Sequence, residues 1–85
     1  MVVMAKQVEH WFNRRYGSNR RDLYLISTGV GWQVVGRVGG AEGRSVPHYF
    51  DDEDEARDML RRMREEVPEG QNDWVQVTAQ RKRPQ

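Results

Sequence analysis

The chain has 85 residues, enough for one small domain and too few for two hydrophobic cores. It has no cysteine, which excludes disulfides, thiol nucleophiles and cysteine-based zinc sites, and no apolar run near the roughly 20 residues that span a bilayer. Charged residues make up 32% of the chain but nearly cancel, giving a net charge of +1. These features favour a soluble cytoplasmic protein that does not associate with membranes.

The charges are distributed unevenly along the sequence. Residues 1–50 carry seven Lys and Arg against three acids, and residues 51–73 carry four Arg against ten acids. Residues 74–85 carry three basic residues and no acid. Charges separated in this way can present a basic surface to an anion, or can pair the molecule with another copy of itself.

The first predicted element is a helix. Apolar residues near the N-terminus follow helical spacing, and Gly17 offers a left-handed stop after them. We therefore expect a short helix over about residues 4–16. The apolar positions are Met4, Val8, Trp11, Phe12 and Tyr16.

Three predicted strands follow. DLYLIS is rich in branched and aromatic residues, and TGVG after it is typical of a turn. In the next strand, WQVVGRV, side chains alternate between two faces, and the set that begins with Trp32 and Val34 is expected to face the core. Arg37 then stands on the outer face, with Gln33 and Val35. After the linker GGAEG, the strand RSVPHYF contains a proline, which cannot donate a ladder hydrogen bond and indicates an edge strand.

The second predicted helix has the strongest sequence signals. Asp51 or Asp52 is expected to cap it, and the acids that follow suit the positive end of the helix dipole. Pro68 is expected to stop it. Apolar residues recur at the spacing of one helix face: Ala56, Met59, Leu60, Met63 and Val67.

The last predicted strand is WVQVT, and residues 80–85 are expected to form a basic disordered tail. The predicted order is α-β-β-β-α-β. This order predicts a single α+β domain over residues 1–79, with an antiparallel sheet of three to four strands and helices packed on one face.

The glycine-rich segment GRVGGAEG does not have the pattern of a nucleotide-binding loop. It lacks the Gly-Lys-Ser/Thr ending of a P-loop, does not match GxGxxG, and lies between two strands rather than before a helix. The helix that comes later starts with carboxylates, which occupy the end where a phosphate would bind. We interpret the segment as a hairpin turn.

Metal and catalytic patterns are also missing from the sequence. The acidic run after Phe50 lacks the D-x-D-x-D-G spacing of a calcium loop. His10 and His48 have no second histidine at ligand spacing, and no serine or threonine lies in a nucleophile elbow. We therefore expect no metal, no cofactor and no enzymatic activity.

One further pattern starts in the third predicted strand and consists of Gly36-Arg37-Val38-Gly39, Gly43, Phe50, Ala56 and Trp74. In these residues the segment 24–74 resembles the WGR domain, a small module of DNA-dependent ADP-ribosyltransferases and of some bacterial proteins. In that family the tryptophan and arginine of the motif meet DNA at a strand break, and the arginine engages backbone phosphate. The resemblance thus implies a phosphate contact for Arg37, while Val35 stands at the tryptophan position and offers no aromatic surface for stacking. The element order is also similar to that of short uncharacterised bacterial protein families.

Two functions compete. The sequence favours a non-catalytic protein-interaction or assembly module, because the acidic helix and basic N-terminal half can complement a partner or a second copy, and the edge at Pro47 can accept a strand. The alternative is a WGR-like module that binds the DNA backbone or a DNA end. Its candidate phosphate-binding residues are Arg37, Arg14, Arg15, Arg20, Arg21 and Arg44.

Overall fold

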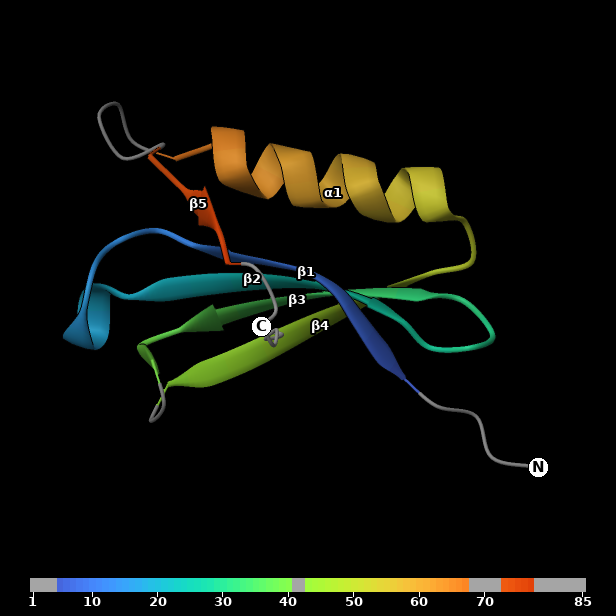
Figure 1. The fold of residues 1–85 in the computed structure, drawn as a ribbon, viewed down its shortest axis with the longest axis horizontal. Helices are drawn as coiled ribbons and strands as arrows, with labels where there is room; N and C mark the ends of the chain where they lie inside the picture. Colours follow the sequence, from blue (N-terminus) through green and yellow to red (C-terminus); the bar gives the residue numbers. More distant parts are fainter. Residues whose placement is uncertain (1–4, 41–42, 68–72, 78–85) are drawn as a thin grey trace, which may run out of the picture.

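The computed structural model describes residues 5–40, 43–67 and 73–77. A five-stranded antiparallel sheet has the spatial order β4-β3-β2-β1-β5, and one helix packs against it (Figure 1). Along the chain the elements are β1 (Lys6–Phe12), the short 3-10 helix η1 (Gly17–Asn19), β2 (Arg21–Ser27), β3 (Trp32–Val38), β4 (Arg44–Phe50), α1 (Glu53–Glu65) and β5 (Val75–Gln76). The basic tail predicted for residues 80–85 lies outside the described residues.

The prediction of a mixed α+β domain is confirmed, but the predicted helix over residues 4–16 is wrong. Residues 6–12 form β1, which pairs with β2 on one side and β5 on the other. The register shifts between Gln7 and Glu9, so the strand carries a bulge. A bulge interrupts the two-residue alternation, and the remaining spacing of apolar residues then imitates a helix. Among the described residues the order is therefore β-β-β-β-α-β, with five strands and one α-helix.

The other strands lie where the sequence predicts them. The three central predictions correspond to β2, β3 and β4, and the prediction that β4 is an edge strand is confirmed by the sheet order. Of the predicted final strand, Thr78 lies outside the described residues, and among residues 73–77 the strand β5 covers Val75–Gln76, which pair with β1.

The core lies between the sheet and α1. Leu23, Leu25 and Val34 from the sheet meet Ala56 and Leu60 from the helix, and all five are buried. At Gly36 a Cβ atom would lie 2.9 Å from the Met63 side chain, so the glycine allows α1 to approach β3 closely. Partly buried side chains surround this cluster: Trp11, Trp32, Phe50, Met59, Met63 and Trp74.

The start of α1 is capped as predicted. Asp52 is the N-cap, and its side chain accepts a hydrogen bond from the Glu55 backbone N–H. Along the outer surface of the helix, arginines pair with acids three and four residues away, as Arg61 does with Asp58 and Glu65. Within Glu53–Glu65, four arginines therefore stand against five acids.

Among the described residues, no helix combines the length and apolar character needed to cross a membrane.

Candidate nucleic-acid interface

The pairing register divides the strand side chains between two faces of the sheet. Directly opposed residues in antiparallel strands project from the same side, and buried Leu23 and Leu25 define the side that α1 covers. No described element lies on the other side, which we call the open face (Figure 1). Its positions form three rows: Gln7, Ile26, Gln33 and Tyr49; His10, Tyr24, Val35 and Pro47; and Phe12, Asp22, Arg37 and Ser45.

The second of these rows, His10, Tyr24, Val35 and Pro47, is the central row. The rings of His10 and Tyr24 stack, with centroids 4.4 Å apart and planes 19° apart. Val35 and Pro47 continue the row on β3 and β4. The middle of the open face is therefore mostly aromatic and apolar.

The third row, together with Arg20, is the cationic row. Arg37 lies directly opposite Asp22 in the β2–β3 pairing, which confirms the prediction that Arg37 stands on the face away from the core. The Arg37 side chain is half-buried. Arg20 comes just before β2 and reaches the same face through its contacts with Asp22.

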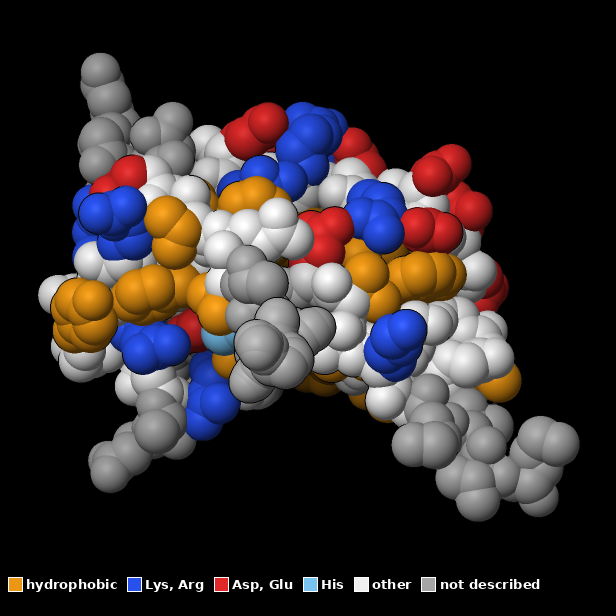
Figure 2. All heavy atoms as spheres, viewed as in Figure 1, with side chains coloured by type: hydrophobic (Ala, Val, Ile, Leu, Met, Phe, Trp, Pro, Cys, Tyr) orange, Lys and Arg blue, Asp and Glu red, His pale blue; other side chains and the backbone are white. Residues whose placement is uncertain are grey.

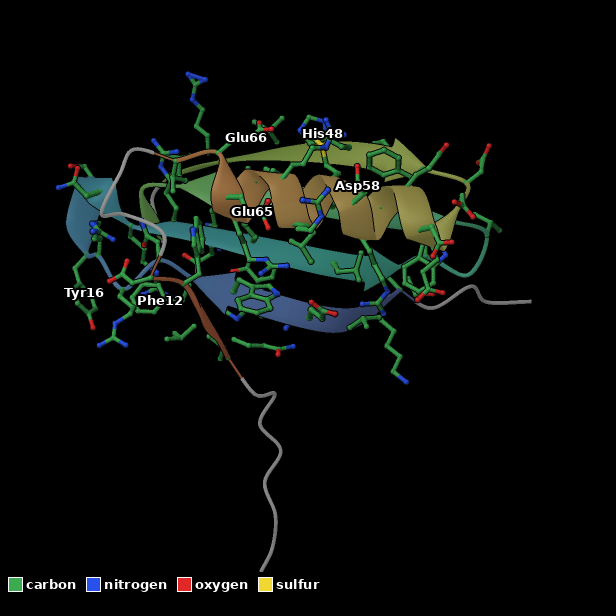
Figure 3. The ribbon with its side chains drawn as sticks, turned by 90° about the horizontal axis from the view of Figure 1, so that it is seen from above. Phe12, Tyr16, His48, Asp58, Glu65 and Glu66 are labelled. Carbon is green, nitrogen blue, oxygen red and sulfur yellow. The ribbon has the colours of Figure 1, made fainter. Side chains whose placement is uncertain are left out.

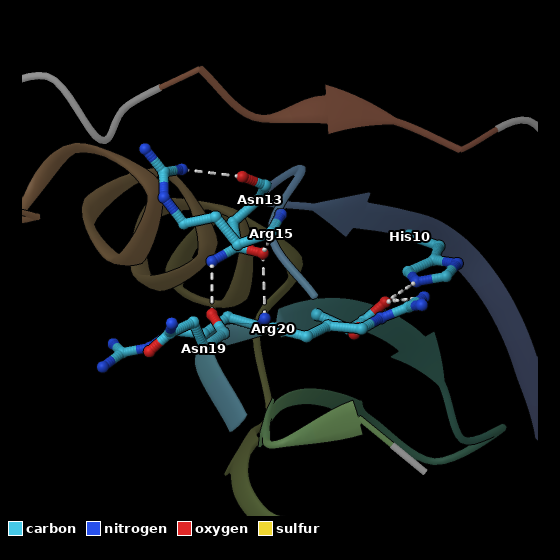
Figure 4. Close-up of polar contacts among 7 residues, drawn as sticks. His10, Asn13, Arg15, Asn19 and Arg20 are labelled. Carbon is cyan, nitrogen blue, oxygen red and sulfur yellow. Dashed lines mark hydrogen bonds and ion pairs between the residues drawn. The ribbon is translucent and has the colours of Figure 1, made fainter. Parts of the chain in front are cut away.

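Asp22 organises the cationic row, although it is only 2% exposed. Its Oδ1 accepts from Arg20 Nε at 2.8 Å, and its Oδ2 accepts from Arg20 Nη2 at 3.1 Å (Figure 4). His10 Nε2 lies 2.7 Å from Asp22 Oδ2, and a carboxylate can only accept, so this nitrogen donates. The buried carboxylate therefore holds two side chains at fixed positions on the open face.

These contacts also shift the pKa values of the Asp22–Arg20 pair. Burial acts to raise the pKa of Asp22, but hydrogen bonds from Arg20 and His10 outweigh it and hold the pKa below its usual value. The hydrogen bond that Arg20 donates to Asp22 raises the pKa of Arg20. Both groups are therefore charged at neutral pH.

Arg20 is also held by an aromatic contact. Its guanidinium carbon lies 4.4 Å from the centroid of the Phe12 ring, in a cation–π arrangement. Phe12 in turn meets Tyr16 edge to face, with centroids 5.5 Å apart. The guanidinium is thus oriented by Asp22 along one edge and by Phe12 across one face.

All six candidate arginines gather at one end of the sheet, which we call the basic end. The β1–β2 and β3–β4 connections meet there, and the Gly39 backbone N–H donates to the Arg20 carbonyl at 2.8 Å. Around this contact is a hollow of about 580 Å³. Its lining residues are Tyr16, Gly17, Ser18, Arg20, Gly39, Gly40 and Gly43.

The six arginines do not form one surface. Arg21 and Arg44 both lie opposite Val38, two residues from Gly36, and so project on the side that α1 covers. Arg15 Nη1 pairs with Asp73 at 3.0 Å, and Arg14 lies exposed in the β1–β2 connection. Arg20 and Arg37 are the two candidates that share the open face.

The interpretation of the glycine-rich segment as a hairpin turn is confirmed, because it joins the antiparallel neighbours β3 and β4. Gly39 has a φ of +97°, which side chains disfavour. At Gly43 a Cβ atom would lie 1.6 Å from the Val38 carbonyl oxygen. Both glycines are required by the turn itself.

Sequence reasoning missed Asn13, which shapes the basic end. Asn13 is buried, and its Oδ1 accepts from the backbone N–H groups of Arg15 and Arg21 at 3.2 and 2.9 Å. Its Nδ2 donates to the Asn19 carbonyl at 3.1 Å (Figure 4). One side chain thus ties together the loop that carries the clustered arginines.

Asp22, His10 and Phe12 were also missed as members of the site. Asp22 had a usable signal, since aspartate is depleted in strands and one at a strand position needs partners. His10 and Phe12 had no such signal, because the wrong helix prediction put Phe12 on an apolar helix face and gave His10 no place in a site.

The acidic side chains lie mainly on the other side of the molecule. Figure 2 shows red side chains concentrated over the α1 half of the molecule. In Figure 3, Asp58 and Glu65 lie along α1, while Phe12 and Tyr16 lie at the basic end. Glu9 belongs to the covered side, where it pairs with Arg57. Asp22 is the one acid among the described strand positions of the open face, and it is buried.

Comparisons with protein-family models, with curated proteins and with solved structures found no match. The resemblance to the WGR domain therefore stays a prediction. Within the part of the chain that the structure describes, no group of three His, Asp or Glu side chains is placed to hold a metal ion. The prediction that the protein is not an enzyme also stays a prediction. What this surface can do is inferred from its own geometry.

Proposed function

We propose that the protein binds nucleic acid by its phosphate backbone, through Arg20 and Arg37 on the open face. The observation that carries this proposal is that two arginines share one face and one end of the sheet, and the one acid between them is buried. Guanidinium groups suit phosphate because their planar donors match its oxygens. A guanidinium already oriented by Asp22 and Phe12 loses less side-chain freedom when it binds.

The acidic helix does not oppose this binding. A helix packed on a sheet lies on the order of 10 Å from it, which is about one Debye length at physiological salt. Three acids of α1, Glu53, Asp58 and Glu65, also pair with arginines on the same helix. A phosphate on the open face is therefore largely screened from them.

The resemblance to the WGR domain also supports a phosphate contact at Arg37. It assigns the phosphate contact to Arg37, and Arg37 projects from the open face beside Asp22. Val35 lies on this face as well, two residues before Arg37 and in the central row. The aromatic surface that the family supplies at this position is supplied here by its neighbour Tyr24.

The proposal is tested by titrating isotope-labelled protein with a short 5′-phosphorylated oligonucleotide at about 50 and 200 mM salt, following the amide signals. We expect shifts around Arg20 and Arg37 that weaken steeply as salt increases. Replacing Arg37 by glutamine should weaken binding several-fold and lower the salt dependence by about one phosphate contact.

The matched control is Arg62→Gln, which removes the same charge from the outer surface of α1. It should leave binding unchanged, and urea denaturation of both variants shows that neither is unfolded. A spectrum that does not move at low salt, or equal losses in the two variants, contradicts the proposal.

A second candidate is an assembly module that uses the free edge of β4. Two apolar side chains on this edge strand are well exposed, Val46 at 53% and Tyr49 at 71%. An edge strand can pair with a strand of a partner or of a second copy. For the second copy, sedimentation at micromolar concentration should detect a dimer that Val46→Asp dissociates. A monomer at that concentration contradicts self-association.

A further inference from the structure

We propose that the nucleic acid is single-stranded and that its bases stack on the central row while its phosphates follow the cationic row. This inference rests on the proposed function and adds the class of nucleic acid. The docking surface is the open face, defined above by its three rows.

The dimensions of the central row suit a nucleobase platform. His10, Tyr24, Val35 and Pro47 come from four neighbouring strands, which lie about 4.8 Å apart, so the row is on the order of 14 Å long. At one end of the row, the stacked His10 and Tyr24 rings are held in place by the bond from His10 to Asp22. Because each ring already covers one face of the other, a base can pack only against the outer side of this pair, which is fixed before binding.

The cationic row runs parallel to this platform. Phe12, Asp22 and Arg37 lie two residues along their strands from His10, Tyr24 and Val35, which is about 7 Å. A nucleotide has its base and its phosphate on opposite sides of the sugar and can bridge two such rows. An apolar row beside a cationic row is the pairing of surfaces that single-strand binding uses.

A duplex fits this surface less well. Its bases are stacked inside the helix, so only phosphates and groove edges reach a protein, whereas unpaired bases expose their ring faces. A duplex backbone laid across the open face would set phosphates over the central row, where no arginine lies among its four residues. The arginines of the open face lie in the cationic row alone, which suits the single phosphate backbone of an unpaired strand.

Tyr49 extends the aromatic surface beyond the central row. It occupies the open-face position of β4 in the row of Gln33 and is 71% exposed. Because it packs little against the protein, it can be removed without disturbing the fold. It therefore separates a role in binding from a role in stability.

The test compares three ligands of equal length, about 12 nucleotides, by fluorescence anisotropy at fixed salt. They are oligothymidine, a duplex of mixed sequence, and an abasic oligodeoxyribose phosphate that keeps the backbone charge and lacks the bases. We expect oligothymidine to bind at least tenfold more tightly than either of the others.

Two variants locate the stacking surface. Tyr24→Leu and Tyr49→Ser should each weaken oligothymidine binding about fivefold or more and leave abasic binding unchanged. Tyr49→Ser keeps the test valid even where Tyr24→Leu lowers stability. Arg62→Gln is the control and should change none of the affinities.

Each contrary outcome has a distinct meaning. Equal affinity for the three ligands, or no effect of Tyr49→Ser, overturns the single-strand inference and leaves backbone binding intact. No binding of any ligand at low salt overturns both. A dimer that buries Tyr49 and excludes oligothymidine shows that a second copy covers the open face, which also overturns the inference.

Discussion

The two faces of the sheet use the same charged residue types in different ways. On the covered side, arginines and acids lie on the outer surface of α1 and pair with one another in solvent, as Arg61 does with Asp58. On the open face, a single buried acid, Asp22, holds Arg20 and His10. The exposed ion pairs lie on a helix whose stability comes from the apolar core beneath it. The buried acid fixes the positions of the side chains around it.

The difference follows from burial. Solvent-exposed ion pairs contribute little, because water screens the charges and both side chains lose freedom on pairing. A buried carboxylate without partners is costly, so it retains its charge only when donors surround it. Asp22 is 2% exposed and has donors from two directions, which makes it a stability element as well as a site element.

The largest expected effect lies on the covered side. Replacing the fully buried Leu25 by alanine should lower the free energy of unfolding by about 2–5 kcal/mol, through lost burial and the cavity left behind. Val30→Ala, at a position 84% exposed, is the control and should change little. Urea denaturation measures both. A cost for Leu25→Ala as small as that of the control would mean that the core is not organised around β2.

An intermediate effect is expected at Asp22. The substitution Asp22→Asn should lower the free energy of unfolding by about 1–3 kcal/mol, because Arg20 and His10 lose a charged acceptor. The effect depends on pH in a definite direction. The pKa of Asp22 is lower in the folded state than in the unfolded chain, where it is about 3.9. The stabilisation is therefore complete above pH of about 5 and is lost as the pH falls through the folded pKa.

The urea midpoint, followed from neutral pH down to about pH 2, separates this carboxyl from the others. The pKa values of Asp58 and Asp73 are also lowered, through hydrogen bonds from Arg61 and Arg15. In acid, the urea midpoint of the wild type should fall to that of Asp22→Asn. The Asp58→Asn variant retains Asp22, so its urea midpoint should still fall with pH as that of the wild type does. A constant difference between wild type and Asp22→Asn at every pH would contradict the ion-paired state.

The smallest effect is expected on the outer surface of α1. Arg61→Gln removes one of the solvent-exposed pairs, and the urea midpoint should stay within experimental error of the wild type. The two urea midpoints should also agree at high salt, because salt screens solvent-exposed ion pairs. A clear loss of stability would show that the pairs on α1 act as a network, and the contrast with Asp22 would disappear.

Local patterns predicted the elements whose signals lie within a few residues. The Asp52 cap and the i, i+3, i+4 repeat predicted α1, because both depend on one helical turn. Alternation along β3 placed Arg37 away from the core, and Pro47 indicated the edge. The candidate arginines were named from the sequence, but their distribution between the two faces of the sheet was not predicted.

Local patterns could not predict the strand β1 or the contacts of Asp22 with His10. The bulge between Gln7 and Glu9 hides the alternation of β1, and pairing with β2 and β5 determines its structure. Asp22 and His10 are 12 residues apart in sequence, and only the β1–β2 register brings them together. Without that register, neither the central row nor the cationic row is visible.

The sequence by itself determined the α+β class, the capped helix, the three central strands and the outward side of Arg37, because each depends on backbone geometry over a few neighbouring residues. Tertiary structure alone decided that the N-terminal segment is a strand, that Arg20 and Arg37 share a face while Arg21 and Arg44 do not, and that Asp22 is buried between donors. The physical reason is that sheet pairing joins residues distant along the chain, and burial then sets which charges must be paired.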